Sequence, residues 1–170
     1  FRQISYDGKL TGTEARFAVT LEAESRSTNE LSAVIFEGDL ALLAPKLPSG
    51  WRIVNQGRQF ILYAGEPGAQ KLEFELVARI TRAEPWNQIR FAGPPSAIAT
   101  VAAQSTDTNV EVQLQSGTPL ETRGAVRNSV RGVLGTDREL ALRWQSKTAE
   151  AARDTLVTVD SKFAARLTPT

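Results

Sequence analysis

The sequence contains no cysteine, no histidine and no methionine. Without cysteine there is no disulfide, no thiolate nucleophile and no cysteine-ligated metal. Without histidine, Ser-His-Asp and Cys-His catalysis and histidine-containing zinc sites are excluded. The sequence also lacks the glycine-rich nucleotide-binding motifs, the G-x-S-x-G nucleophile motif and the EF-hand loop. These absences predict a protein that is not an enzyme and that carries no cofactor or metal.

Neither sign of charge is in excess, because the sequence has 20 basic and 19 acidic residues, for a net charge of +1. Nucleic-acid binding needs a clustered excess of lysine and arginine, so we expect no nucleic-acid partner. No stretch approaches the roughly 18 apolar residues of a membrane helix, which argues against direct membrane insertion. The chain begins at Phe1, and we interpret it as a piece of a longer protein.

What the sequence does have is a period of two, which is typical of β-strands. Apolar and charged residues alternate over 15–24 and over 71–81, as expected for antiparallel sheets with one solvated face. Asn55-Gln56-Gly57 between two further runs predicts a hairpin. Shorter strands are predicted at 32–36, 51–54, 59–63, 86–91, 97–103, 110–114, 130–134 and 140–144. Helix is limited to one turn at 39–43 and two turns at 147–154.

Turn signals recur along the chain at the spacing of sandwiches and barrels, among them Asp7-Gly8 and Gly132. We therefore predict an all-β fold, an antiparallel β-sandwich of Ig-like or jelly-roll-like type with very little helix. Gly93-Pro94-Pro95 is unsuited to a central strand and coincides with a drop in aromatic content. It predicts two small modules, a β-sandwich at 1–92 and a smaller β module at 93–148. Residues 149–170 would be a linker and a strand of a further module.

Three aromatic residues are candidate ligand or partner contacts: Trp51, Tyr63 and Trp86. Each lies in a run whose alternation also allows it to point into the core, where tryptophan is usually largely buried. Exposure of two of these rings on one face would favour stacking on sugars, whereas burial would make them core residues.

Three arginines recur every four residues and are also candidate contacts: Arg123, Arg127 and Arg131. In an extended chain they share one face and would form an anion-binding strip. The alternative is a solvated edge strand protected by charge.

Acidic pairs such as Glu73 and Glu75 have a spacing that carboxylate-only hydrolases use. They alternate with a core face, so we interpret them as the solvated side of a strand.

Three groups of residues carry a resemblance to a class of proteins. They are Tyr6-Asp7-Gly8-Lys9-Leu10 with Ala15-Arg16-Phe17, the Gly68 turn before Leu72-Glu73-Phe74, and Leu140-Ala141-Leu142-Arg143-Trp144. In this order they resemble the serial β-sandwich modules of large secreted bacterial proteins. The resemblance implies an extracytoplasmic module (periplasmic, cell-surface or secreted) without an activity of its own.

The function expected from the sequence is that of a non-enzymatic structural or protein-interaction module of a larger extracytoplasmic bacterial protein. Its partners would be another protein or neighbouring modules of the same chain, bound through free sheet edges or through a strand at 155–167. The alternative is a carbohydrate-binding module that uses surface aromatics to bind a glycan.

Overall fold

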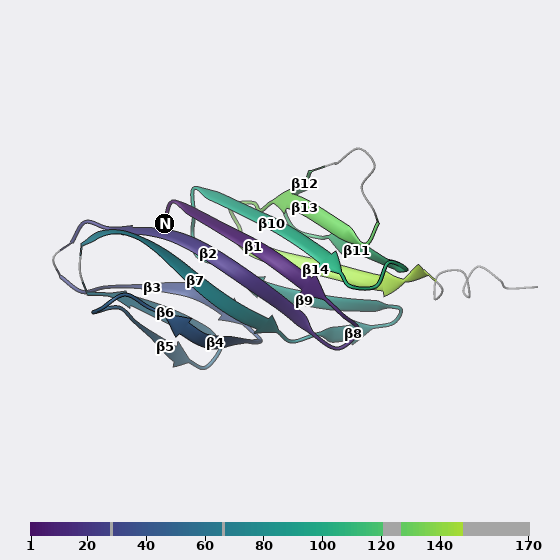
Figure 1. Ribbon diagram of the computed structural model, residues 1–170, viewed down its shortest axis with the longest axis horizontal. Coiled ribbons are helices and arrows are strands. Elements are labelled where there is room, and N and C mark those ends of the chain that lie inside the picture. Colours follow the sequence, from purple (N-terminus) through teal and green to yellow (C-terminus); the bar gives the residue numbers. More distant parts are fainter. Residues whose placement is uncertain (28, 66, 121–126, 148–170) are drawn as a thin grey trace, which may run out of the picture.

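The structure is a computed structural model of the 170-residue chain, and it describes residues 1–27, 29–65, 67–120 and 127–147. Fourteen strands make up the regular elements within these residues, and they form two seven-stranded sheets. The predicted all-β sandwich fold is therefore confirmed. Figure 1 shows the two layers, with β10, β1, β2 and β7 side by side in the front one.

The first sheet, sheet A, has the order β12-β13-β10-β1-β2-β7-β4. Its strands are β12 (Thr118–Pro119), β13 (Ser129–Val133), β10 (Ile98–Ser105), β1 (Gln3–Leu10), β2 (Ala15–Ser25), β7 (Gly68–Ala78) and β4 (Leu40–Lys46).

Sheet B has the order β11-β14-β9-β3-β6-β5, and β8 pairs with β9. Its strands are β11 (Val110–Leu114), β14 (Glu139–Ser146), β9 (Trp86–Ala92), β3 (Leu31–Gly38), β6 (Gln59–Ala64), β5 (Arg52–Gln56) and β8 (Thr81–Ala83).

The core lies between the sheets, and the alternation of the two longest strands explains its position. In β2 and in residues 72–78 of β7 every second side chain is buried, as a strand with one solvated face requires. Aromatic rings interlock across the layers in edge-to-face pairs, with Phe36 against Phe74 at 5.6 Å and Phe17 against Phe91 at 5.6 Å between ring centroids. The Trp144 ring is buried as well, and its Nε1 donates a 3.0 Å hydrogen bond to the carbonyl of Thr11.

One pairing departs from the predicted antiparallel pattern, because β1 and β10 run parallel. Parallel neighbours need a crossover connection, and here the chain passes through sheet B before it returns to sheet A as β10. The last step of that return is the segment Gly93-Pro94-Pro95, which leads from β9 in sheet B to β10 in sheet A.

This connection corrects the predicted domain boundary. Strands from both sides of residue 93 lie within each sheet: β10 pairs with β1, and β14 pairs with β9. The predicted modules 1–92 and 93–148 therefore share one sandwich over the described residues. The prolines interrupt a strand, as expected, but the interruption is a passage between layers and not a linker between domains.

Three local predictions are also corrected. Residues 39–43 were expected to form a helical turn, but Leu40–Lys46 is the strand β4, which pairs with β7. Asp7-Gly8 was expected to be a turn, but it lies inside β1. Glycine is required there because a Cβ on Gly8 would lie 2.5 Å from Cε1 of Phe17 on the neighbouring strand. Gly132, another expected turn, likewise lies within β13.

The hairpin predicted around Asn55-Gln56-Gly57 is confirmed as β5 and β6, with Gln56 opposite Gln59. Gly57 has a φ of +68°, a conformation that favours glycine in a tight turn. All but Lys147 of the predicted helical turns at 147–154 lie outside the described residues, as do the predicted strand at 155–167 and Arg123.

Candidate interaction surface

The three predicted aromatic contacts are not brought together. Trp51 is a core residue with 7% of its surface exposed, and it lines an apolar hollow of about 220 Å³ together with Phe1, Leu31 and Leu62. Since its ring packs between the layers, it offers no face to a sugar.

The other two rings are partly buried on the outer side of sheet B, and an arginine covers each of them. The Arg52 guanidinium lies 3.9 Å from the centre of the Tyr63 ring, and that of Arg143 lies 4.2 Å from the centre of the Trp86 ring. Tyr63 and Trp86 lie at opposite ends of sheet B, on either side of the short pairing between β3 and β9. The described residues therefore contain no shared stacking platform built from these rings.

The predicted arginine strip is only partly visible. Arg127 lies in the turn before β13, where its backbone carbonyl accepts a 2.9 Å hydrogen bond from the amide of Val112. Arg131 lies within β13 and is exposed on the outer face of sheet A. Arg131 is thus the member of the strip that a partner could reach on a sheet surface.

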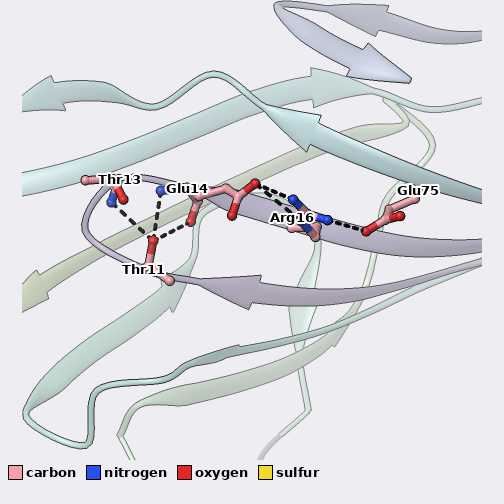
Figure 2. A network of polar contacts seen from close by, with 5 residues as sticks. All are labelled: Thr11, Thr13, Glu14, Arg16 and Glu75. Carbon is pink, nitrogen blue, oxygen red and sulfur yellow. Dashed lines mark hydrogen bonds and ion pairs between the residues drawn. The ribbon is translucent and has the colours of Figure 1, made fainter. Parts of the chain in front are cut away.

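One half of the outer face of sheet A, formed by β2 and β7, is covered by ion pairs. Figure 2 shows its best-connected part, where Arg16 donates hydrogen bonds of 2.8 Å to Glu14 and 2.7 Å to Glu75. These two carboxylates raise the pKa of the Arg16 guanidinium. Thr11 accepts a 2.9 Å hydrogen bond from the amide of Glu14 and so holds the turn between β1 and β2.

The same charged half includes a second small network around Glu24. Its carboxylate is paired with Arg2 at 2.6 Å and with Arg26 at 3.1 Å, and the hydrogen bonds from Arg26 and Arg2 lower the pKa of Glu24. Lys71 pairs with Glu73 at 3.4 Å. All of these groups are accessible to solvent, so each pair adds little stability, and the charged half is satisfied by water and by its own counter-ions.

The other half of the outer face of sheet A is different in kind. Three of the four exposed large apolar side chains of the described residues gather there: Ile98 (52% exposed), Leu120 (54%) and Val133 (39%). Ile98 begins β10, Val133 ends β13, and Leu120 follows β12, with its amide bonded to the carbonyl of Arg131. We call this region the apolar half-face; its outward residues are Ile98, Thr100, Ala102, Thr118, Leu120, Arg131 and Val133.

The pairing registers show that these residues form rows across the strands. Val133 lies opposite both Thr100 of β10 and Thr118 of β12, while Arg131 lies opposite Ala102. Arg131 is the one charged residue of the apolar half-face, and it has no ion pair with any described residue. An exposed apolar area of this kind, next to one that carries several ion pairs, is typical of a surface that contacts another molecule.

Ile98, Leu120 and Val133 were not predicted from the sequence to be surface residues. A signal for them existed: Val133 has the same strand parity as Arg131, which was expected to be exposed. Apolar residues on both sides of a strand normally indicate a buried strand, and this is why the outward set passed unnoticed.

Further hollows lie elsewhere on the surface of the described residues. A shallow one of about 690 Å³ lies beside Asp39, Arg79 and Arg82. Another, of about 360 Å³, is lined by Tyr6, Pro94 and Arg138, among others. The described residues contain no group of three or more histidine, cysteine, aspartate or glutamate side chains that could hold a metal ion. Nor does any helix among them have the length and apolar character to cross a membrane.

No protein-family model matches the chain, and no curated protein matches it. Solved structures align with much of the chain. Yeast LTA4 hydrolase aligns with 85% of this chain at 10% identity and a TM-score of 0.46, over 28% of its own length. An M1 zinc metallopeptidase from Deinococcus radiodurans aligns with 85% at 11% identity and a TM-score of 0.45, over 41% of its length.

An aminopeptidase N family protein from Idiomarina loihiensis aligns with 84% of this chain at 9% identity and a TM-score of 0.50. The aligned region is 29% of that protein, so the present chain spans less than a third of it. At this identity the likeness shows the fold alone: the chain has a two-sheet β-sandwich architecture that also forms part of an aminopeptidase N family protein.

Proposed function

We propose that this chain is a non-catalytic β-sandwich domain of a longer protein and that it associates with protein surfaces through the apolar half-face. The observation that carries the proposal is the contrast within one face of sheet A. Several ion pairs lie on β2 and β7, whereas Ile98, Leu120 and Val133 are exposed on and next to the strands beyond β1. An apolar surface that contacts nothing promotes aggregation, so its occurrence on a folded domain favours association.

Two facts support a role without catalysis. The 170 residues contain no histidine, so they do not supply the paired histidines of an H-E-x-x-H zinc site. The likeness to the aminopeptidase N family protein covers 29% of that chain and leaves most of it outside the alignment. A location outside the cytoplasm, the likeness to serial modules of secreted proteins and the alternative of glycan binding stay predictions from the sequence.

Site-specific photo-crosslinking in the cells that produce the protein tests the association. A photoreactive residue at Val133 should crosslink to protein, whereas the same residue at Glu73, in the charged half, should not. Equal crosslinking at both positions, or none at either, would argue against the proposed surface.

The non-catalytic part has its own test. The purified chain, supplied with zinc, should not hydrolyse aminoacyl or short peptide substrates above the rate in buffer. Hydrolysis that survives repurification would overturn that part of the proposal.

A further inference from the structure

The outer face of sheet A is complementary to itself in both size and charge. β10 lies in the middle of the five strands β12, β13, β10, β1 and β2. One row of outward residues runs Arg131, Ala102, Asp7 and Ala18 across four of these strands. The large or basic members lie on the β13 side of β10, and the small or acidic members lie on the β1 side.

We propose that two copies of this chain associate face to face through this surface, about a two-fold axis that runs along β10. A half-turn about that line places the β13 side of one copy over the β1 side of the other. Arg131 of each copy then faces Asp7 of the second copy, so one rotation creates two ion pairs. This inference rests on the proposed function, because it names a second copy as the protein that covers the apolar half-face.

Charge is the first argument. Arg131 and Asp7 are both exposed, and neither has an ion-pair partner among the described residues. They lie on either side of β10, about two strand spacings of 4.8 Å apart. Covering Arg131 with a purely apolar surface would bury an unpaired cation, which is strongly unfavourable. The symmetric arrangement supplies a carboxylate to each guanidinium.

Size is the second argument. The next row runs Val133, Thr100, Ser5 and Thr20, so Val133 of one copy would lie over Ser5 of the other. Leu120, whose amide bonds to the carbonyl of Arg131, would lie over Ala18. Ile98 lies on the axis strand and would meet its own symmetry mate. Away from this Ile98 pair on the axis, the large side chains Val133 and Leu120 face the small residues Ser5 and Ala18.

No like charges of the described residues meet in this arrangement. The row that contains Lys9 continues through Gln104 to Ser129, so Lys9 of one copy would face Ser129 of the other.

The area of the proposed interface follows from strand geometry. Five strands about 4.8 Å apart make it roughly 24 Å wide, and seven residues that rise about 3.3 Å each make it roughly 23 Å long. The two copies together would bury about 1,100 Å². This area lies at the lower end of the range for specific interfaces, so we expect reversible association.

Reversing the charges at Arg131 and Asp7 tests the proposal, and sedimentation equilibrium measures the dissociation constant of the dimer. The wild-type chain should form a dimer whose dissociation constant is below about 1 mM. Arg131→Glu and Asp7→Lys, each alone, should weaken the dimer at least tenfold, because each places like charges opposite one another. An equimolar mixture of the two variants should recover association as a heterodimer, since both ion pairs then form with reversed sign. The double variant should also recover it.

The matched control is Glu73→Lys in the charged half, which should leave the dissociation constant unchanged. Circular dichroism and urea midpoints equal to the wild type would show that each exposed substitution leaves the fold intact. The inference is overturned if the single variants dimerise like the wild type, or if the mixture fails to recover. A monomeric wild type together with crosslinking at Val133 would refute the self-association and leave the proposed function standing. A monomeric wild type without crosslinking at Val133 would refute both the self-association and the proposed function.

Discussion

Replacing Tyr6 with phenylalanine removes one oxygen atom from the interior of the sandwich. Tyr6 projects from β1 between the layers, where its ring packs edge-to-face on Phe91 at 5.8 Å between centroids. Only 2% of its surface is exposed, and its hydroxyl has no hydrogen-bond partner among the described residues. A buried hydroxyl without a partner loses its hydration and gains nothing in return.

The expected effect of Tyr6→Phe is therefore stabilisation. An unsatisfied buried polar group costs about 1–3 kcal/mol, and phenylalanine keeps the ring contact with Phe91. We expect the free energy of unfolding, measured by urea titration, to rise by about 1–2 kcal/mol. A loss of about 1 kcal/mol or more would refute the reasoning, because it would mean that the hydroxyl makes a favourable bond, for example to a buried water.

Gly93 provides a second arm of the same experiment. A Cβ on Gly93 would overlap the Tyr6 hydroxyl, so Gly93→Ala should destabilise the wild type by about 1–3 kcal/mol. In the Tyr6→Phe background the nearest ring carbon is 3.2 Å away, so the cost should fall by about 1 kcal/mol or more. Gly12→Ala is the control, since nothing lies within 4 Å of a Cβ at Gly12. Equal costs of Gly93→Ala in both backgrounds would contradict the overlap.

The same hydroxyl predicts a dependence of stability on alkaline pH. Burial raises the pKa of Tyr6 in the folded state above its usual value. The folded chain then holds the phenol proton more tightly than the unfolded chain does. The contribution of this proton to the free energy of unfolding is fully present below about pH 10, and it is lost as the pH rises towards the folded-state pKa. Above about pH 10 the wild type should lose up to about 1.4 kcal/mol per pH unit from this group, and Tyr6→Phe should not show that part of the loss.

Three further substitutions separate core from surface. Gly8→Ala should destabilise the chain by about 1–3 kcal/mol in urea titrations, because its Cβ would press on the Phe17 ring; a change as small as that of Gly12→Ala would contradict this. Trp51→Ala should cost about 3–5 kcal/mol as a core truncation, and a folded variant of unchanged stability would show that the ring is at the surface. Arg16→Gln should leave the urea midpoint unchanged within error, since its ion pairs are fully exposed; a clear fall in midpoint would give those pairs a structural role.

Much of the fold could be predicted because strand alternation is a local signal. β2 alternates over its eleven residues and β7 over 72–78, and the hairpin of β5 and β6 is specified by Gly57 at its turn. The layer to which each strand belongs is a long-range property. Nothing near Gly93-Pro94-Pro95 shows whether the chain leaves the domain or crosses to the opposite sheet, and the outcome depends on pairing with β1, some 95 residues earlier.

The candidate surface was less predictable than the fold for a related reason. Arg131 could be singled out by its spacing, but the other large residues of the apolar half-face include Leu120, which follows β12, and Ile98, which begins β10. Their meeting on one face requires the strand order, which a single sequence does not encode locally. Trp51 and Tyr63 were predicted as contacts because they are aromatic. Trp51 instead packs in the core, and an arginine covers the ring of Tyr63.

The most direct test of the interaction surface is hydroxyl-radical footprinting of four exposed apolar side chains. Ile98, Leu120 and Val133 lie on the apolar half-face, and Leu31, with 47% exposure, lies away from it as an internal reference. Oxidation would be measured on the dilute purified chain and on the protein in the cells that produce it. Relative to Leu31, oxidation of the three should fall in the cells, because a protein partner covers them. Unchanged oxidation ratios would contradict the account.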